Sequence, residues 1–434
     1  MKKHTQSPYE SSKVSYKPSG IEWLGEIPQS WKNVSIRSCF TESNQRCNTD
    51  SYPLLSVTIA NGIIYQDDIE NKKDISNDDK SNYKIVPLNA VAYNKMRMWQ
   101  GAVGVNTLTT GIVSPAYIVA IPNEKILPNF VSYLFKSKIM ISEFDKNSYG
   151  LCLDMNNLRY DDFRNIKIPL PPLQEQKEIA EFLDSKCEKI QNYIDKKQKL
   201  ITLLQEKKQA LINEVVTKGL NPNIELKSGI DYLGLIPHHW EVKKLKHICK
   251  INPQTNETLP NNFVYIDLES VAKGQLLKEQ TINKEQAPSR AQRILQKQDI
   301  LFQLVRPYQR NNYIFNKNGD YVASTGYAQI RTKECVNFVY YALLENSFVE
   351  RVILKSTGSN YPAITSNDFA DLKIPLPPLQ EQEEIVEFLD SKVAQIDSVI
   401  EKTKKQIKLI KEYKNTLINE AVCGRINLQK KERI

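Results

Sequence analysis

A nine-residue motif that occurs twice constrains the fold of this chain more than any other feature. The string IPLPPLQEQ stands at 168–176 and again, unchanged, at 374–382, which is 206 positions later. Similarity continues without a gap after each copy, from EIAEFLDSK and EIVEFLDSK to ALINEVV and TLINEAV. The 434 residues therefore form two similar halves, and any fold proposed for one half must also serve the other.

A second repeated segment precedes each variable region. SGIEWLGEIPQSW at 19–31 returns as SGIDYLGLIPHHW at 228–240, at an offset of 209. The variable regions between the two anchors are nearly equal in length, so we expect two equivalent modules. The predicted boundaries are an N-terminal segment at 1–31, a first module at 32–167, a first helix at 168–220, a linker at 221–240 that repeats 12–31, a second module at 241–373, a second helix at 374–424 and a tail at 425–434.

Each segment that follows the motif has the pattern of one long helix. The prolines at 171–172 and 377–378 suit a helix start, where a missing N–H costs little, and a glutamate follows in each first turn. Gly219 and Gly424 suit the C-terminal stops. Between these ends, residues spaced by threes and fours form the seam of a coiled coil. They are Ile179, Leu183, Cys187, Ile190, Ile194, Lys197, Ile201, Leu204, Lys208, Leu211 and Val215, and then Ile385, Leu389, Val393, Ile396, Ile400, Thr403, Ile407, Ile410, Lys414, Leu417 and Ala421.

The two long seams predict that the helices pair with each other. An antiparallel pair lets the chain run module, helix, module, helix, with the segment 1–31 docking at the end of the second helix and closing a pseudo-twofold ring. The alternative is two independent amphipathic helices, each lying on its own module. In the paired arrangement the repeated aromatic residues are packing anchors. They are Trp23, Trp31, Tyr232 and Trp240.

The modules combine strand and helix patterns. LNAVAY, GIVSPAYIVAI, FVYIDL and DYVASTGYAQIRT are rich in β-branched and aromatic residues, whereas NFVSYLFKSKIMISEF and NFVYYALLENSFVERVIL are typical of short helices. The predicted fold class is therefore α+β. It consists of two tandem modules, each followed by a long helix, and the two helices form an antiparallel coiled coil with pseudo-twofold symmetry.

The distribution of charge indicates an acidic partner for the modules. The chain has a formal net charge of +9. Residues 174–218 carry nine lysines against eight acidic residues, and residues 380–424 carry seven lysines against nine. The two helices therefore sum to −1 and the rest of the chain to +10, which favours nucleic-acid binding outside the helices.

Other classes of protein lack support in the sequence. The start MKKHTQSPYE has no apolar stretch, and no run approaches the ~18 apolar residues of a membrane span, so we expect a cytoplasmic protein without membrane contact. The seven scattered cysteines include no C-x-x-C pair, and the adjacent His238 and His239 have no third ligand nearby, so neither disulfides nor a metal site is expected. No phosphate loop, N-P-P-[FY]-like tetrapeptide or glycine-rich nucleotide fingerprint is present, so methylation or cleavage would have to come from partners.

This order of motifs resembles that of the specificity subunits of type I restriction-modification systems. Members of that family have two variable target-recognition domains, each followed by a long helix that an IPLPPLQEQ-like motif opens, with SGIEWLGEIP-like segments between them. The resemblance covers essentially the whole chain. It implies that each module reads one half of a split target in double-stranded DNA, and that the helical pair spaces the modules. Because these domains vary so much between members, the DNA sequence that is read cannot be carried over.

The resemblance also implies which components lie outside this chain. Two methyltransferase subunits bind the helical pair, and restriction or translocase subunits join in the full complex. This chain then has no catalytic centre and no cofactor of its own. S-adenosylmethionine, ATP and Mg are expected on the partner subunits.

Two pairs of segments are candidates for DNA contact. At the offset of 209, YNKMRMWQ at 93–100 matches FQLVRPYQ at 302–309. Arginine can bond guanine, Asn or Gln can bond adenine, and an aromatic ring can stack, whereas Lys95 and Arg310 would hold phosphate. The loops NSYG at 147–150 and STGSNY at 356–361 form the second pair. The candidate residues are Asn94, Lys95, Arg97, Trp99, Gln100, Tyr149, Gln303, Arg306, Tyr308, Gln309, Arg310, Asn360 and Tyr361. Structural salt bridges remain the alternative for Arg97 and Arg306.

The repeated Gln-Glu-Gln is a candidate for partner contact, because two identical subunits require two equivalent surfaces. The residues are Gln174, Glu175, Gln176, Gln380, Glu381 and Gln382. The alternative is that the motif only starts a helix. Taken together, these patterns predict a non-catalytic DNA-recognition subunit of a type I restriction-modification complex. Its rivals are a recognition subunit of another restriction system with the same layout, a coiled-coil scaffold that binds no DNA, and an autonomous enzyme.

Overall fold

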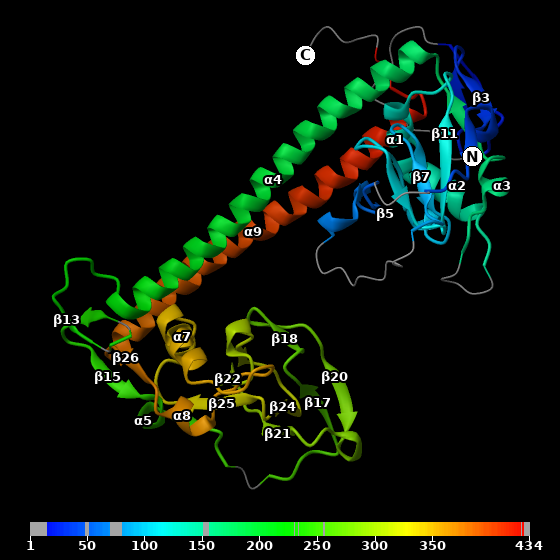
Figure 1. The fold of residues 1–434 in the computed structure, drawn as a ribbon. Coiled ribbons are helices and arrows are strands. Elements are labelled where there is room, and N and C mark those ends of the chain that lie inside the picture. Colours follow the sequence, from blue (N-terminus) through cyan, green and yellow to red (C-terminus); the bar gives the residue numbers. More distant parts are fainter. Residues whose placement is uncertain are drawn as a thin grey trace, which may run out of the picture. The chain divides into compact units, whose positions relative to one another are not determined.

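The computed structural model describes residues 15–47, 52–69, 80–150, 156–229, 231–232, 234–254, 257–426 and 428. The chain forms two compact units, which we call unit 1 (1–197 with 405–434) and unit 2 (198–404). Both boundaries fall inside the long helices α4 (Leu173–Lys218) and α9 (Leu379–Val422). Each unit therefore consists of one module and one part of each long helix (Figure 1).

The long helices confirm the predicted seam. Unit 1 holds the first part of α4 and the last part of α9, and unit 2 holds the last part of α4 and the first part of α9, so the two parts run antiparallel within each unit (Figure 1). Every predicted seam residue is buried or half-buried. In unit 2 the seam includes an ion pair, in which Lys208 Nζ lies 2.8 Å from each carboxylate oxygen of Asp397. The predicted helix stops are also confirmed, because Gly219 and Gly424 each follow their helix with a positive φ of 73°.

Each module is built around a four-stranded antiparallel sheet with the same strand order in both units. The order is β4-β11-β8-β9 in unit 1 and β16-β25-β22-β23 in unit 2. The apolar run of β8 follows from its place between two strands, where Val91, Ala92 and Tyr93 are all buried. The strands are β4 (Phe40–Ser43), β8 (Val91–Asn94), β9 (Val103–Val105), β11 (Tyr117–Pro122), β16 (Cys249–Ile251), β22 (Asp299–Gln303), β23 (Tyr313–Phe315) and β25 (Tyr327–Thr332).

Two consecutive short helices follow the sheet in each unit, as the sequence predicts. They are α1 (Pro128–Lys136) and α2 (Lys138–Lys146) in unit 1, and α6 (Val336–Leu343) and α7 (Asn346–Leu354) in unit 2. The junction between them is a helix cap in both units, formed by Ser137 and by Glu345. A third, shorter helix then leads toward each long helix, α3 (Tyr160–Phe163) or α8 (Ser366–Ala370).

The remaining strands of the two modules differ. Unit 1 has the hairpin β5 (Leu55–Thr58) and β6 (Gly62–Tyr65) and the pair β7 (Lys84–Val86) and β10 (Gly111–Val113). Unit 2 instead has a four-stranded sheet of order β20-β17-β24-β21 and the pair β18 (Val271–Ala272) and β19 (Gln275–Leu276). The strands of that sheet are β17 (Asn262–Ile266), β20 (Gln280–Asn283), β21 (Ala291–Ile294) and β24 (Tyr321–Ser324). The modules therefore share one sheet and diverge in the other.

The repeated segments form matching strand pairs around each helix start. The pairs are β1 (Tyr16–Pro18) with β2 (Glu26–Pro28), β3 (Lys32–Ser35) with β12 (Lys167–Leu170), β13 (Leu226–Ser228) with β14 (Leu235–Pro237), and β15 (Glu241–Lys244) with β26 (Lys373–Leu376). Trp31 and Trp240 are almost completely buried, Trp23 is half-buried, and the Tyr232 hydroxyl donates to the Lys373 carbonyl. Packing roles therefore suit these aromatic side chains.

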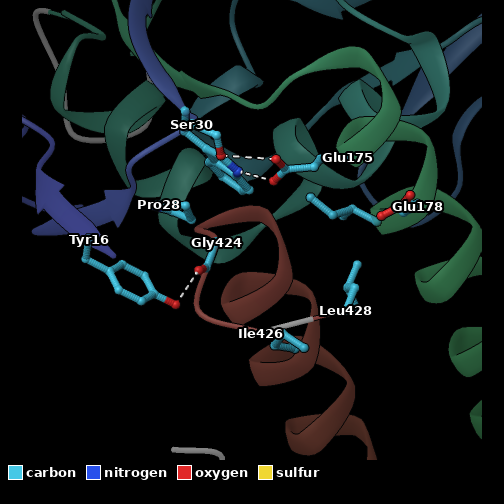
Figure 2. A pocket seen from close by; sticks show the side chains of 10 residues that line it. Tyr16, Pro28, Ser30, Glu175, Glu178, Gly424, Ile426 and Leu428 are labelled. Atoms are coloured by element: carbon cyan, nitrogen blue, oxygen red, sulfur yellow. Dashed lines mark hydrogen bonds between the residues drawn. The ribbon is translucent and has the colours of Figure 1, made fainter. Parts of the chain in front are cut away.

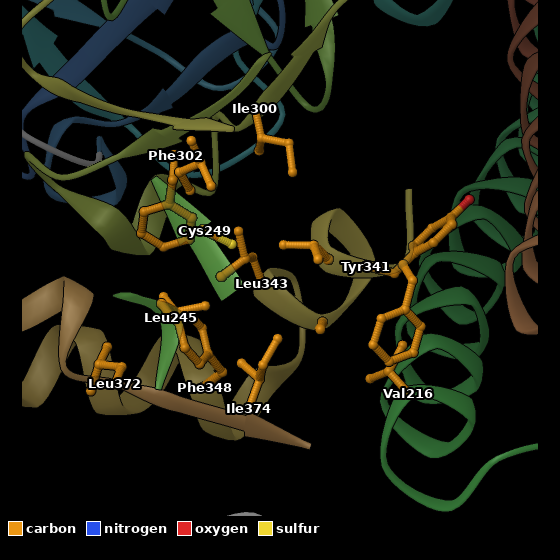
Figure 3. Close-up of a cluster of buried hydrophobic side chains, with 14 of the residues drawn as sticks. Val216, Leu245, Cys249, Ile300, Phe302, Tyr341, Leu343, Phe348, Leu372 and Ile374 are labelled. Atoms are coloured by element: carbon orange, nitrogen blue, oxygen red, sulfur yellow. The ribbon is translucent and has the colours of Figure 1, made fainter. Parts of the chain in front are cut away.

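The core of unit 2 joins its module to the long helices (Figure 3). Apolar side chains of the sheet and of the short helices α6 and α7 pack in one buried cluster with Val216 of α4 and with Ile385 and Leu389 of α9. Such burial stabilises by about 25 cal/mol per Å² of apolar surface, so the module and the helices support each other. Among the residues that the structure describes, no helix combines the length and apolar character that a membrane crossing requires.

Candidate nucleic-acid interface

The matched segments of the two modules form equivalent turns. In unit 1, β8 leads directly into the 3-10 helix η3 (Met98–Gln100), and in unit 2, β22 leads into η5 (Pro307–Gln309). Each turn is anchored by its first helical residue, Met98 or Pro307, which is buried. We call residues 94–101 turn 1 and residues 303–310 turn 2. The offset of 209 read from the sequence therefore aligns the same structural feature in both units.

Turn 1 presents its candidate side chains at the surface. Asn94 Oδ1 accepts from the backbone N–H of Met96 at 3.0 Å, and Trp99 Nε1 donates to the Met96 carbonyl at 3.0 Å. These two bonds fix the shape of the turn. Arg97 and Gln100 are exposed, and Lys95 is half-buried. Arg97 forms no ion pair with any residue that the structure describes, and its side chain is open to solvent.

Turn 2 uses three of its candidate residues, Gln303, Gln309 and Arg310, in hydrogen bonds within its own unit. Gln303 is 1% exposed, its amide donates to Gln309 Oε1 at 2.8 Å, and its carbonyl oxygen accepts from the Asn311 N–H at 3.1 Å. Arg310 Nη1 donates to Asn346 Oδ1 at 2.7 Å, and burial lowers the pKa of its guanidinium group. Gln303 is therefore too buried to face a base and shapes the turn instead, whereas phosphate contact by the half-buried Arg310 stays a prediction.

Turn 2 also brings the two predicted DNA-contact segments of its module together. The Arg306 guanidinium carbon lies 4.2 Å from the ring centre of Tyr361, which belongs to the STGSNY loop. The Arg306 N–H donates to the Pro362 carbonyl at 2.7 Å, and Arg306 has a positive φ of 55°. Tyr361 is 66% exposed and Tyr308 is 51% exposed, and Asn360 is exposed beside them. An arginine stacked on an exposed aromatic ring is a preorganised surface for planar bases.

The loop of unit 1 lies at the same place. The Leu158 N–H donates to the Lys95 carbonyl at 2.8 Å, as the Ile364 N–H donates to the Leu304 carbonyl at 3.2 Å in unit 2. Tyr149 is 59% exposed, and its hydroxyl donates to Asp162 Oδ1 at 3.2 Å. The negative charge of Asp162, and then this hydrogen bond, raise the pKa of the phenol. The residues 151–155, which include Cys152, lie outside the described residues. Neither Arg97 nor Arg306 has a carboxylate partner in the described parts of its unit, so the salt-bridge alternative is not observed there.

A small pocket marks the helix start of unit 1 (Figure 2). The Glu175 carboxylate accepts from Ser30 Oγ at 3.0 Å and from Trp31 Nε1 at 2.6 Å. The Tyr16 hydroxyl donates to the Gly424 carbonyl at 3.1 Å, so the N-terminal segment lies against the end of α9. Closure of a ring through both units stays a prediction.

The helix start of unit 2 is fastened by different side chains. His239 Nε2 lies 2.7 Å from Glu381 Oε2. Trp240 Nε1 is buried and has no hydrogen-bond partner among the described residues, in contrast to its counterpart Trp31. Glu175 and Glu381 therefore both bind the repeated aromatic segment of their own unit, through different donors.

The last glutamine of each motif is structural, which corrects the expected partner contact for two residues. Gln176 is fully buried, accepts from the Leu127 N–H at 2.7 Å and donates to the carbonyls of Lys125 and Pro171. Gln382 is equally buried, accepts from the Cys335 N–H and donates to Glu334 and to the Pro377 carbonyl.

The first glutamine of each motif, by contrast, faces outward. Gln174 and Gln380 are exposed, and each donates to a glutamate one helical turn later. Within the motif, partner contact therefore stays a prediction for these two side chains and for the half-buried Glu175 and Glu381.

Sequence reasoning missed Lys136, the last residue of α1. Its ammonium group donates to three backbone carbonyls, those of Thr58, Ile59 and Gly101, at 3.3, 2.6 and 3.0 Å. Burial lowers its pKa to about 8. The sequence shows only a lysine at the end of an apolar helix, a pattern that is typical of an ordinary helix C-terminus.

Comparisons with known proteins agree with this arrangement. A family model described as the type I restriction modification DNA specificity domain matches residues 31–203 and 237–409. The type I restriction enzyme MjaVIII specificity subunit of Methanocaldococcus jannaschii is 27% identical over 343 residues, which cover 74% of this chain and 75% of that protein. The putative MjaX specificity subunit of the same organism is 25% identical, covering 94% of this chain and 96% of that protein.

Solved structures share the fold. A chain from a structure on complex assembly and conformational transition of the type I R-M system superposes with a TM-score of 0.70 at 17% identity, covering 92% of this chain and 99% of that one. The HsdS subunit from Thermoanaerobacter tengcongensis superposes with a TM-score of 0.53 at 18% identity, covering 92% of this chain and 98% of that one. Because the family model matches most of the chain, and matches it twice, this protein belongs to the type I restriction modification DNA specificity domain family.

Proposed function

We propose that this chain is the DNA sequence-recognition subunit of a type I restriction-modification complex, and that each unit reads one half of a bipartite target. The observation that carries this proposal is the pair of equivalent turns. Each presents an arginine without an ion-pair partner among the described residues at the same place in the module, and in turn 2 that arginine stacks on Tyr361. Arginine is the commonest reader of guanine in the major groove.

The charge of the chain supports DNA rather than a neutral partner. The long helices together are nearly neutral, so the modules and the segments next to them carry the excess of positive charge. A polyanion releases counterions when such a surface binds it, so binding by this chain weakens steeply as salt rises. A scaffold that binds no DNA would not need this excess, and we therefore favour the recognition subunit over that rival.

The partners follow from the family. Relatives of this chain are named specificity subunits of type I restriction enzymes, and we infer that this chain likewise joins two methyltransferase subunits and, in the full complex, restriction subunits. Gln174 and Gln380 provide two equivalent exposed positions for the two methyltransferases. The chain acts without catalysis of its own, and S-adenosylmethionine, ATP and Mg bind to the partner subunits.

Methylome sequencing tests the proposal. The chain is expressed with its own methyltransferase partner in a host that lacks other methylation, and methylated positions are mapped by single-molecule sequencing. We expect one motif made of two specified half-sites separated by a spacer of fixed length. A continuous motif without a spacer would contradict the bipartite reading. Absence of new methylation by a complex that assembles and binds S-adenosylmethionine would contradict the role itself.

A further inference from the structure

Each unit has one positively charged side chain between its turn and the helix junction behind it, but the two units place this side chain at different positions. Gly101 closes turn 1 and Arg310 closes turn 2, at the offset of 209 that aligns the turns, and both residues have a positive φ. Lys136 ends α1, and its counterpart Leu344 caps α6 just before the second short helix. A cation is therefore present once in each pair, but on opposite partners.

In unit 1 the cation comes from the helix. The three N–H donors of the Lys136 ammonium group match the three carbonyls that accept them, so the group is saturated without any carboxylate. One carbonyl belongs to Gly101 at the end of turn 1, and the other two belong to the tip of the β5–β6 hairpin. Lys136 thereby ties the turn and the hairpin to α1.

In unit 2 the cation comes from the turn. Arg310 Nη1 donates to Asn346 Oδ1 at 2.7 Å and to the Leu344 carbonyl at 3.4 Å, and both acceptors lie at the junction of α6 and α7. The Leu344 carbonyl also accepts from Gln209 Nε2 at 2.9 Å, so the same junction is bonded to α4. Turn 2 is thus fastened to the helix junction that corresponds to the end of α1 in unit 1.

We propose that Lys136 and Arg310 are positioning residues, each of which fixes the base-reading turn of its own unit against the helix junction behind it. This inference rests on the proposed function. Base readout requires donors held within a fraction of an ångström of their acceptors, and a turn fastened only through its own backbone bonds is a poor frame for that. We call the bonds of Lys136 joint 1 and the bonds of Arg310 joint 2. Each joint fixes the end of its turn, at Gly101 or Arg310. It thereby holds Arg97 or Arg306, four residues earlier, at the angle that one base requires.

The bonds of Lys136 depend on pH, whereas those of Arg310 do not, so a pH series can test the two sets of bonds separately. Burial is the cause that lowers the pKa of Lys136 to about 8. The charged side chains on the elements packed around it are Arg97 beside η3 and Lys138, Glu143, Asp145 and Lys146 on α2, and none of them is a cause of this shift. As pH rises through about 8 the ammonium of the folded protein loses its proton, whereas an arginine stays protonated. Only the half-site read by unit 1 is then expected to lose definition at alkaline pH.

The test measures discrimination at each half-site separately. The full chain, assembled with its methyltransferase partner, binds duplexes that carry the cognate target, a substitution in one half-site, or a substitution in the other. Lys136→Met is expected to reduce discrimination at one half-site by about tenfold, and Arg310→Met at the other, because each loses hydrogen bonds from a charged donor. Lys138→Met, which removes an exposed lysine two residues away, serves as the matched control.

A second arm of the test starts from the unchanged protein sequence and varies the pH. Between pH 7 and pH 9 the wild-type complex is expected to lose discrimination at the unit 1 half-site while the unit 2 half-site, as internal control, stays constant. Lys136→Arg is expected to remove this pH dependence, and this arm decides the matter if Lys136→Met does not fold. Equal weakening for all duplexes, or unchanged discrimination in both arms, overturns the inference. A wild-type complex without two half-sites would instead contradict the proposed function.

Discussion

The buried glutamines of the two helix starts have kept their main contacts, whereas the two turns have kept their places and changed their contacts. Gln176 and Gln382 are both fully buried, and each accepts one backbone N–H and donates to the proline carbonyl five residues earlier. In the turns, the matched Asn94 is half-buried and accepts from the backbone N–H of Met96, whereas Gln303 is buried and bonds the Gln309 side chain and the Asn311 N–H.

The difference follows from what each region must fit. A helix start packs against its own module and its own long helix, so both copies must fit the same internal packing. A turn at the surface has to fit its proposed DNA half-site. The residues behind the turn can therefore change as long as they still hold it in place. Of these two matched regions, the turns have therefore diverged more than the buried glutamines of the helix starts.

The buried glutamines offer the largest test of this comparison. Gln176→Leu and Gln382→Leu each leave a backbone N–H and at least one carbonyl without a partner, and each is expected to lower the free energy of unfolding by about 2 to 4 kcal/mol. Urea denaturation measures the loss. Gln174→Leu, at the exposed position of the same motif, is the control, with an expected change within about 0.5 kcal/mol. A large loss in only one copy would break the equivalence of the two helix starts.

The arginines of the turns come next in expected size. Arg97→Ala is expected to relax one half-site, and Arg306→Ala the other, each by about 1 to 3 kcal/mol of discrimination measured from dissociation constants on substituted duplexes. Tyr361→Leu removes the ring under Arg306 and is expected to act like a weaker Arg306→Ala, whereas Tyr361→Phe keeps the ring and serves as control. Equal weakening on all sequences, nonspecific DNA included, would identify the arginines as phosphate contacts.

The buried tryptophans give the smallest and most local test. Trp31 Nε1 donates to Glu175, but Trp240 Nε1 has no partner in the described structure. Both Trp→Phe changes remove similar volume, so their difference isolates the hydrogen bond. We expect Trp31→Phe to lower the free energy of unfolding by about 1 to 2 kcal/mol more than Trp240→Phe does, as read from chemical denaturation. Equal losses would mean that the Glu175 bond adds nothing to stability.

Much of the fold is predictable from the sequence because its strongest signals are repeats. The seam residues, the glycine stops and the paired short helices all follow from spacing within one chain. The correspondence of the turns is also visible, since Arg97 and Arg306 stand at one offset. A repeat supplies its own alignment, and periodicity then fixes which face is buried.

The roles of single polar residues are not predictable in the same way. Gln303 is predicted to read a base and Arg310 to hold phosphate because both match a surface motif, but Gln303 is buried and both side chains bond internal partners. Lys136 carries no signal at all, because its three acceptors are backbone carbonyls from two distant segments. In unit 1, Lys136 donates to the Gly101 carbonyl of the turn, and in unit 2, Arg310 of the turn donates to the Leu344 carbonyl. Only the three-dimensional structure shows that these two contacts replace each other.

The cation that fixes the turn comes from the helix in unit 1 and from the turn itself in unit 2. This difference limits which segments recombination can exchange between the modules. A crossover that places turn 2 in the first module would set an arginine against Lys136, where a side chain at the Gly101 position also approaches Ile141 to within 2.8 Å. The reverse crossover would leave the Leu344 and Asn346 oxygens without the donor that Arg310 supplies. Whole modules, cut at the repeated segments that flank them, are therefore the smallest cassettes that natural shuffling or protein engineering can trade without loss.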